Sequence, residues 1–356
     1  MTQSKDIKST PLLSICINTR NRKDLLKETL DSFIADIQKC SELVEILVVD
    51  GQSTDGTLEL LQEYSRKFPY FRFHSPDELV GIDEGYDLSV IHATGNYCWM
   101  MPDDDLLVAG GLLKICDELR SERDLYIVNL ECYTKTLKTD LKQRLYTRGS
   151  DRTYQLPEDR ELFLNDCLLG LSYIGSVVIR RDLWFDLDRS LYYGSYFAHV
   201  AVILGSERLH SIRYIDEPII LYRSANSSWT PRSFEIWNMK WPELVWEFEG
   251  DRIPSLEQIV PREFWNNKRT VLKSRAMGEY NLDLYRRYFS GRSNIRSRWA
   301  LLIIAFLPIC FLNSVVLLHC LFFKRSGLYT IYNVMSSSRC PQLSRLLVRA
   351  LGLRLA

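Results

Sequence analysis

The sequence predicts an α/β protein with a mostly parallel sheet. Short apolar runs rich in Val, Ile and Leu recur early in the chain, and stretches with apolar side chains at helical spacing separate them. Runs of this kind are typical of strands that helices cover on both faces. In addition, polar residues directly follow several of the runs. Ligands of such sheets bind beyond the carboxyl ends of the strands, so these polar residues are candidates for a binding site.

The predicted strands and helices alternate with short connections, which is the pattern of a parallel α/β sheet. The helix between the first two strands has Leu, Phe and Ile at intervals of three and four residues. The next helix follows residues 53–56 (STDG), whose side-chain oxygens can accept hydrogen bonds from its first free N–H groups. In chain order we expect a strand at 12–18, a helix at 25–37, a strand at 44–49, a helix after 56, a strand at 71–74, a helix at 82–93 and a strand at 96–101.

Three consecutive aspartates, Asp103, Asp104 and Asp105, follow the last of these strands. Carboxylates so close together repel one another unless a cation or a proton lies between them. Mg²⁺ and Mn²⁺ prefer oxygen ligands, and Mg²⁺ is commonly held by one or two carboxylates together with substrate phosphates. The cluster is therefore a candidate metal site, and the alternative is an Asp-rich turn that only caps a helix.

Polar residues also follow the first and second predicted strands. They are residues 18–22 (NTRNR), which include Thr19 and Arg22, and Asp50. Because the carboxyl ends of parallel strands meet at one edge of a sheet, we expect these side chains to converge with the aspartate cluster. Each residue alone fits an ordinary turn, whereas the set in this order favours a ligand site.

Segments 17–22 (INTRNR) and 48–57 (VVDGQSTDGT), followed by the aspartate cluster, resemble the motifs of family-2 glycosyltransferases. That family has the GT-A fold, a Rossmann-like, mostly parallel sheet with flanking helices, and the resemblance covers the first third of the chain. Residues 95–99 (GNYCW), 173–176 (YIGS) and 180–184 (RRDLW) further resemble abequosyltransferase-like enzymes of bacterial surface polysaccharide (O-antigen) synthesis.

The resemblance implies a glycosyltransferase of the hexosyltransferase type. Such an enzyme moves a sugar from a nucleotide-sugar donor to a hydroxyl of a saccharide acceptor, with Mn²⁺ or Mg²⁺ on the aspartate motif. Asp103, Asp104 and Asp105 are the expected metal ligands, and Asp105 is also assigned to catalysis. The expected nucleotide contacts are Thr19, Arg22, Asp50, Asp83, Asp103, Asp104 and Arg223.

The position of the general base departs from the family pattern. Inverting members often carry a Glu-Asp pair on a helix in the second half of the domain, and His199 stands at the best matching position. A neutral imidazole can accept the proton of the acceptor hydroxyl. The alternative is a helix histidine packed against aromatic side chains. The departure leaves open whether the enzyme inverts or retains the anomeric configuration of the transferred sugar. A second hypothesis is a catalytically inactive protein that binds a sugar nucleotide or a lipid.

The net charge of zero hides an asymmetry along the chain. Residues 291–356 contain nine Lys or Arg and no Asp or Glu. Within them, residues 299–323 carry no charge, and a run of about 20 apolar residues can cross a bilayer. Pro308 and the basic residues on both flanks favour a kinked helix or a shallow hairpin that enters one leaflet. Residues 341–356 mix Leu with Arg, as in an interfacial helix. The alternative is a pair of helices packed on the catalytic domain or in a dimer.

Four segments are predicted: a polar tail at 1–10, a GT-A domain at 11–232, a helical linker or acceptor region at 233–290, and a basic, apolar, membrane-associating tail at 291–356. The membrane surface is an expected partner through 296–325 and 341–356. Together with the resemblance, this tail implies a polyprenyl-diphosphate-linked acceptor and a location at the cytoplasmic face of the bacterial inner membrane.

Composition argues against several other classes. The nine cysteines are odd in number and scattered, and residues 1–10 have no apolar signal core, which favours a reducing compartment. No GxGxxG turn follows the first strand, which argues against a dehydrogenase. The basic residues of the tail are interrupted by an apolar stretch and carry no RNA-reading motif, so nucleic acid is not an expected partner.

Overall fold

The computed structural model describes residues 10–226, 232–291, 298–323 and 327–336, and the single residues 342 and 345. The chain divides into two compact units, Met1–Leu130 with Arg144–Tyr222, and Glu131–Gln143 with Arg223–Ala356. Residues 131–143 therefore group with the C-terminal part of the chain, and the predicted domain boundaries at residues 232 and 290 stay predictions.

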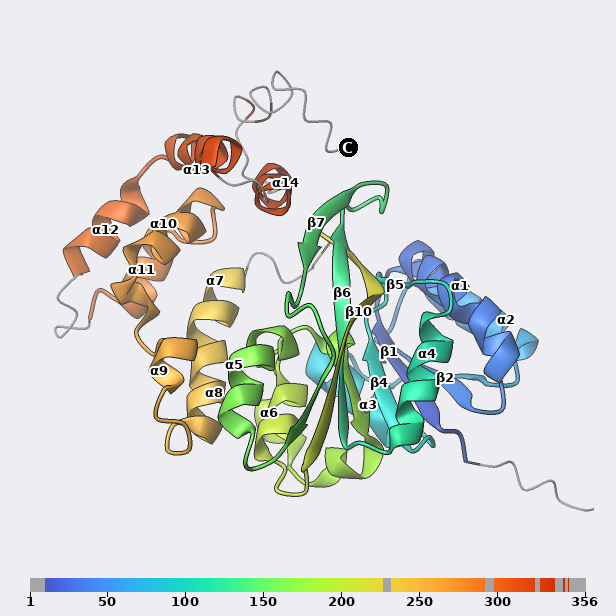
Figure 1. The fold of residues 1–356 in the computed structure, drawn as a ribbon. Coiled ribbons are helices and arrows are strands. Elements are labelled where there is room, and N and C mark those ends of the chain that lie inside the picture. Colours follow the sequence, from blue (N-terminus) through green and yellow to red (C-terminus); the bar gives the residue numbers. More distant parts are fainter. Residues whose placement is uncertain are drawn as a thin grey trace, which may run out of the picture. The chain divides into compact units, whose positions relative to one another are not determined.

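The first unit is built on a mixed sheet with the strand order β3-β2-β1-β4-β9-β6-β10-β5 (Figure 1). Strands β3, β2, β1 and β4 are parallel. Strand β9 is antiparallel to both β4 and β6, and β5 is antiparallel to β10. The predicted parallel sheet is thus confirmed for its first four strands. The strands are β1 (Leu13–Thr19), β2 (Val44–Asp50), β3 (Phe71–His74), β4 (Tyr97–Met101), β5 (Leu106–Leu107), β6 (Leu125–Tyr133), β8 (Arg152–Gln155), β9 (Val177–Arg180) and β10 (Ser211–Arg223).

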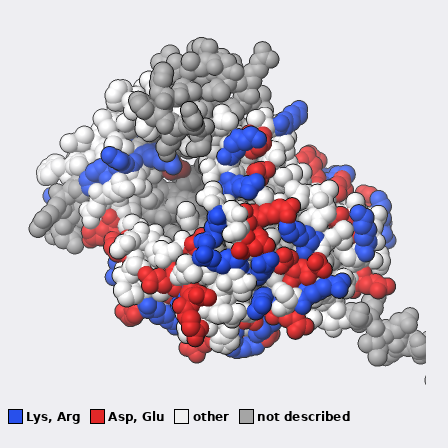
Figure 2. Space-filling model, in the orientation of Figure 1, with Lys and Arg blue, Asp and Glu red and all other residues white. Residues whose placement is uncertain are grey.

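The helices α1, α2 and α3 of the first unit lie at or close to the predicted positions, whereas no positions were predicted for α4, α5 and α6. Leu26, Leu30, Phe33 and Ile37 form the buried face of α1 and have the spacing from which this helix was predicted. On the face drawn in Figure 2, acidic and basic side chains are interspersed over this unit. The helices are α1 (Lys23–Cys40), α2 (Thr57–Lys67), α3 (Ile82–His92), α4 (Gly111–Glu118), α5 (Arg160–Leu171) and α6 (Ala198–Gly205).

Strand β2 shows why its sequence is mostly apolar, with Glu45 inside it and Asp50 at its end. All of its residues are buried, including Glu45. The Glu45 carboxylate accepts a hydrogen bond from Ser14 Oγ at 2.7 Å and pairs with Arg72 at 2.8 Å, so its charge is compensated. In the register of β1 and β2, Thr19 lies opposite Asp50, which brings the ends of the two strands together at one edge of the sheet.

The second unit is mainly helical and has an aromatic core. Helix α12 packs against this core through Leu301 and Ile304, and the buried aromatic residues of the cluster are Phe234, Phe264, Trp265, Tyr280, Tyr285 and Phe289. Strand β7 (Asp140–Arg144) pairs with β6. The helices are α7 (Ser233–Glu235), α8 (Trp241–Glu249), α9 (Leu256–Ile259), α10 (Lys268–Ala276), α11 (Leu282–Tyr288), α12 (Arg298–Phe306), α13 (Ile309–Phe323) and α14 (Leu328–Ser336).

The apolar segment 299–323 forms two helices, α12 and α13, an arrangement that fits both the predicted kinked helix or hairpin and the alternative of a packed helical pair. In the described part of the chain no single helix is long and apolar enough to cross a membrane. The helical segments Arg298–Phe306 and Ile309–Cys320 are long and apolar enough only when they are taken together, and their axes are bent by 95° at the break between them. The interfacial helix predicted at 341–356 lies outside the described residues, apart from residues 342 and 345.

Candidate active site

The loops that follow β1 and β2 are joined by hydrogen bonds at the carboxyl edge of the sheet. The backbone N–H of Asn21 donates to Ser53 Oγ at 2.8 Å, and Asn21 Oδ1 accepts from the N–H of Thr54 at 2.7 Å. Asn21 has a φ of 52°, in the left-handed region that Asn tolerates better than most residues. The two loops therefore hold each other in place, and with them the residues between β1 and α1.

Asp55 links the first turns of two helices. Its carboxylate accepts hydrogen bonds from the N–H of Lys23 at 3.0 Å and from the N–H of Thr57 at 3.1 Å. These are the first residues of α1 and α2, where N–H groups have no partner within the helix. The prediction that residues 53–56 cap the second helix is confirmed for Asp55, and the same carboxylate also fixes the start of α1.

Asp50, the last residue of β2, is only 2% exposed. It accepts hydrogen bonds from Ser53 Oγ at 2.5 Å and from the Ser53 N–H at 3.3 Å. Both donors come from the loop that follows the strand, so the carboxylate is oriented by its own turn. A carboxylate held in this way offers a fixed hydrogen-bond acceptor at the edge of the sheet.

Thr19 and Arg22 meet the aspartate cluster, as the sequence predicts. Thr19 Oγ1 donates to Asp103 Oδ2 at 2.7 Å. Arg22 Nε lies 3.2 Å from Asp103 Oδ1, and the Arg22 guanidinium also pairs with Asp104. These contacts bring the end of β1 and the turn after β4 together, so the predicted convergence of the two strand ends is confirmed.

Asp105 is held by a residue that the sequence did not single out. The hydroxyl of Tyr173 donates to Asp105 Oδ2 at 2.6 Å, and Asp105 is 1% exposed. The ring of Tyr222 packs edge-on against the ring of Tyr173, with centroids 5.5 Å apart. Tyr173 belongs to the segment YIGS that carries part of the family resemblance, and this was the available signal for its role.

The crowding of carboxylates changes the ionisation of their neighbours. Burial, and secondarily the charge of Asp104, raise the pKa of Asp103 to about 7, although Arg22 opposes this shift. Burial and the three aspartates hold the pKa of the Tyr86 hydroxyl well above its usual value. The neutral Tyr86 hydroxyl donates to the carbonyl oxygen of Met101 at 3.3 Å, directly before the aspartate turn.

The structure does not gather the three predicted metal ligands around one point. In the residues it describes, no group of three or more His, Cys, Asp or Glu side chains is arranged to hold a metal ion. The physical reason lies in their partners, because Asp103 turns toward Thr19 and Arg22 whereas Asp105 turns toward Tyr173. Asp104 and Asp105 supply oxygen donors, which are the ligands that Mg²⁺ and Mn²⁺ prefer, so the donor chemistry of this pair fits such a cation.

Asp83 lies in the first turn of α3 and holds the loop that precedes α6. Its carboxylate accepts hydrogen bonds from the N–H groups of Gly194 at 2.8 Å, Tyr196 at 3.0 Å and Ala198 at 3.3 Å. Tyr196 has a φ of 74°, which is costly for a residue with a side chain. In this structure Asp83, predicted to be a nucleotide contact, fixes the turn that leads into α6.

His199 lies in the first turn of α6 and is 2% exposed. Its Nε2 atom lies 2.8 Å from the carbonyl oxygen of Leu171, the last residue of α5. Burial lowers the pKa of His199 to about 4, so the ring is neutral at pH 7. The burial agrees with a packed helix histidine, and the role of His199 as the general base stays a prediction.

Arg223 belongs to the second unit. It is buried, and its Nη1 atom donates to the carbonyl oxygen of Lys135 at 2.8 Å. Its observed partner is therefore in the hairpin of β6 and β7, and its predicted contact with a diphosphate stays a prediction.

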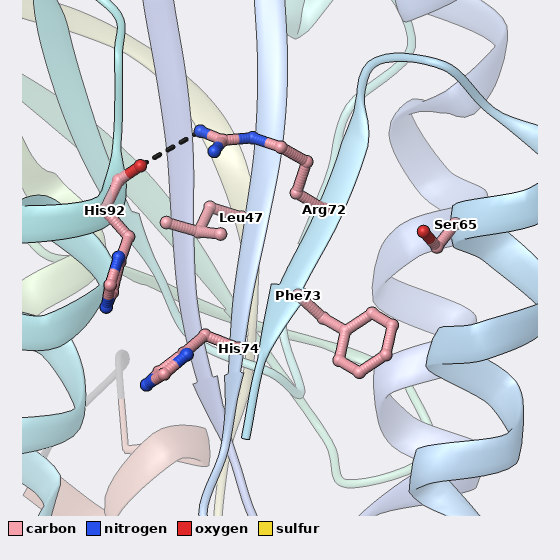
Figure 3. Close-up of a pocket in the computed structure, with 6 residues that line it drawn as sticks. All are labelled: Leu47, Ser65, Arg72, Phe73, His74 and His92. Carbon is pink, nitrogen blue, oxygen red and sulfur yellow. Dashed lines mark hydrogen bonds between the residues drawn. The ribbon is translucent and has the colours of Figure 1, made fainter. Parts of the chain in front are cut away.

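A cavity of about 290 Å³ lies beside the edge strand β3 and is separate from the residues around the aspartates. Figure 3 shows the imidazoles of His74 and His92 on the same side of the strand, and their centroids are 4.4 Å apart. Arg72 donates to the carbonyl oxygen of His92 at 3.0 Å. None of the predicted site residues is among the residues that line this cavity, which are Leu47, Ser65, Arg72, Phe73, His74 and His92.

A substitution at Gly85 tests the packing between α3 and the end of β1. A Cβ atom at Gly85 would lie 2.3 Å from Asn18 Oδ1, so Asn18 would have to move. We expect Gly85→Val to lower the free energy of unfolding by about 1–3 kcal/mol, the usual cost of overpacking. Gly81→Val is the matched control, because a Cβ at Gly81 meets no atom within 4 Å. Equal urea midpoints for the two variants would show that this close approach is unimportant.

The mixed α/β sheet and the polar side chains gathered at the carboxyl edge of its strands define an α/β protein with a candidate ligand site at that edge. A family model described as Glycosyl transferase family 2 matches residues 14–183. Abequosyltransferase RfbV of Salmonella typhimurium is 32% identical over 234 residues, which are 61% of this chain and 68% of that protein. The chondroitin synthase of Escherichia coli is 29% identical over 147 residues, or 41% of this chain and 20% of that protein. The chain belongs to glycosyl transferase family 2 and is a glycosyltransferase.

Solved structures resemble the fold along most of the chain. Residues 1–349 of S. aureus TarS in complex with UDP align with a TM-score of 0.55 and 16% identity, covering 91% of this chain and 90% of that one. The complex of the same protein with UDP-GlcNAc has a TM-score of 0.54 and 15% identity, with the same coverage. At these identities the likeness concerns the fold alone, and with the family match it confirms the predicted GT-A-like fold.

Proposed function

We propose that this glycosyltransferase moves a sugar from a nucleotide-sugar donor to a hydroxyl of a lipid-linked saccharide during bacterial surface polysaccharide synthesis. The observation that carries the proposal is the convergence of Thr19, Arg22 and Asp103 at the edge of the sheet where Asp50 also lies. The relative named abequosyltransferase and the TarS complexes with UDP and UDP-GlcNAc support the donor class.

Asp50 and Arg22 suit the two ends of a nucleoside diphosphate. The buried Asp50 carboxylate is a fixed acceptor for N–H or O–H groups of the nucleoside. The Arg22 guanidinium supplies positive charge beside the aspartates and can offset their repulsion of a diphosphate. Thr19 positions Asp103 and thereby keeps the end of β1 in contact with the aspartate turn.

Mn²⁺ or Mg²⁺ is the proposed cofactor, and Asp104 and Asp105 are the residues that would hold it. When bound there, the cation would neutralise charge on the departing nucleoside diphosphate as a Lewis acid. The chain's own contribution is to orient these carboxylates: the Arg22 guanidinium pairs with Asp104, and the Tyr173 hydroxyl donates to Asp105. Asp103 joins the end of β1 to the aspartate turn through Thr19 and Arg22, and it is proposed as a positioning residue rather than a ligand.

The cytoplasmic face of the bacterial inner membrane is the proposed location. Nucleotide sugars are soluble, whereas a polyprenyl-diphosphate acceptor lies in the bilayer, so the enzyme must work where the two meet. Residues 291–356, with nine basic and no acidic residues, support this location because basic segments are attracted to anionic lipid surfaces.

Binding of UDP-, GDP-, CDP- and dTDP-sugars, measured by calorimetry with and without Mn²⁺, tests the proposal. We expect one nucleotide class to bind, more tightly with Mn²⁺, and Asp50→Asn to weaken that binding about tenfold or more because one charged hydrogen-bond acceptor is lost. Asp117→Asn is the control, since the side chain of Asp117 is 84% exposed. Absence of binding by every donor would refute the proposal. Binding without turnover on any acceptor would favour the inactive sugar-nucleotide-binding alternative.

A further inference from the structure

Helices α12 and α13 present apolar side chains on two faces. The inner face packs within the second unit, where Leu301 and Ile304 join one core cluster and Leu317 joins another. The opposite face is exposed to a degree that is unusual for large apolar side chains. The exposed fractions are 69% for Trp299, 61% for Ile303, 65% for Phe306, 60% for Phe311, 47% for Val315 and 40% for Leu318, and these six residues are named the outer apolar face.

The outer apolar face follows the helical repeat. Its members on α12 are separated by four and then three residues, and those on α13 have the same spacing. Residues at these intervals lie along one side of a helix. The outer side of a helix in a water-soluble unit normally carries charged or polar residues. Here segment 299–323 has none that is charged, so the pattern favours an apolar environment on this side.

The bend between the two helices is fixed from inside the second unit. The Nε atom of Arg275, on α10, donates to the carbonyl oxygen of Leu307 at the bend, at 2.9 Å. Asn313, which is 1% exposed, donates from Nδ2 to the carbonyl oxygen of Ala276 at 3.2 Å. Polar groups that would be costly in a straight membrane span therefore bind α10 instead. The bend between α12 and α13 is therefore bound to α10 through the inner faces of the two helices. The outer apolar face remains available for another occupant.

We infer that the outer apolar face rests in the interfacial layer of an anionic lipid bilayer, with both helices on one side of the membrane. Charge supports a lipid surface over a second protein, because residues 291–356 are basic without a single acidic residue. The Arg298 guanidinium carbon lies 5.9 Å from the ring centroid of Trp299, which pairs a basic and an amphipathic aromatic side chain as at membrane interfaces. The inference specifies how the proposed membrane location is achieved, and it requires neither a particular donor nor a particular acceptor.

Flotation of the full chain with phosphatidylcholine vesicles, with and without phosphatidylglycerol, tests the inference. We expect binding that is stronger with phosphatidylglycerol and is released by alkaline carbonate, as for an interfacial protein. The triple variant Trp299→Ser, Ile303→Ser, Phe306→Ser should lower the partition coefficient at least about tenfold, because three apolar side chains no longer enter the lipid. The corresponding variant on α13, Phe311→Ser, Val315→Ser, Leu318→Ser, should do the same if both helices lie in the interface.

Leu169→Ser and Leu191→Ser are matched controls, since these leucines are 71% and 74% exposed in the first unit and should leave vesicle binding unchanged. Equal flotation of the wild type and both triple variants would overturn the inference. Vesicle binding that resists alkaline carbonate would also overturn it, because such resistance indicates a membrane span. A third contradicting result would be a chain that never binds vesicles but forms a dimer without lipid, with this dimer lost in the triple variants. Donor binding by calorimetry separates the two proposals: vesicle binding without donor binding would refute the proposed function alone.

Discussion

Asp104→Asn and Asp105→Asn are each expected to lower kcat by about 10²–10³-fold while the protein stays folded. Losing one group that stabilises transition-state charge costs about this much in other enzymes. Asp104 pairs with Arg22, and Asp105 accepts the hydroxyl of Tyr173 at 2.6 Å. An asparagine oxygen can still accept both contacts, so the change removes charge and metal affinity more than it removes structure.

Metal removal gives the same prediction a second readout. Chelation of Mn²⁺ or Mg²⁺ should abolish turnover of the wild type, and adding the cation back should restore it. Each Asp→Asn variant should then need more Mn²⁺ for half-maximal activity, a shift that a purely structural role would not produce. Asp117→Asn, at a surface position, should behave as the wild type. Full activity of both Asp104→Asn and Asp105→Asn would refute the assignment of these two carboxylates to the metal.

The parallel half of the sheet could be predicted from local sequence because its strands are buried on both faces. Strand β2 is buried along its whole length, so its sequence is apolar apart from Glu45 and the terminal Asp50, and α1 shows its buried face as a regular repeat. The convergence of Thr19 with the aspartates also follows from topology, since parallel neighbouring strands end at one edge. In these cases the signal lies within a few residues of the feature that it predicts.

The contacts made by the second half of the first unit could not be predicted in this way. Tyr173 reaches Asp105 across 68 residues of sequence, and Asp83 holds the loop at 194–198 from more than a hundred residues away. No local spacing encodes either pairing. The assignment of residues 131–143 to the second unit has the same origin, because it depends on packing between distant segments.

Replacement of His199 is expected to change stability much more than chemistry. In His199→Ala the imidazole leaves a cavity, and the carbonyl oxygen of Leu171 loses its partner at 2.8 Å. Together these losses should lower the free energy of unfolding by about 2–4 kcal/mol, a large part of the total for most domains. His199→Gln, which can keep a donor toward Leu171, should recover part of the loss. Urea unfolding at pH 7 measures both values.

The pH dependence of unfolding provides an independent test of the burial of His199. The pKa of His199 is about 4 in the folded protein, below the value of about 6.5 for an exposed histidine. Above pH 6.5 the ring is neutral in both states and contributes nothing to the pH dependence. As the pH falls from 6.5 toward 4 the unfolded chain takes up the proton first, so stability is lost over this range, by about 3 kcal/mol in total. His199→Gln should remove this part of the acid sensitivity, whereas His210→Gln, at an exposed position, should keep it.

The two roles of His199 make opposite predictions for kinetics. A histidine that holds the end of α5 acts through Leu171 on the segment that carries Tyr173, two residues further on, and Tyr173 in turn orients Asp105. Folded His199→Gln should therefore lose less than about tenfold in kcat, with an unchanged pH profile, because glutamine preserves the contact. Loss of a general base would instead cost about 10²–10⁴-fold and remove the acidic limb of the profile. A loss of about 10²–10⁴-fold in a fully folded variant would support His199 as the general base. It would also require the loop before α6 to open during turnover, because His199 is buried in this structure.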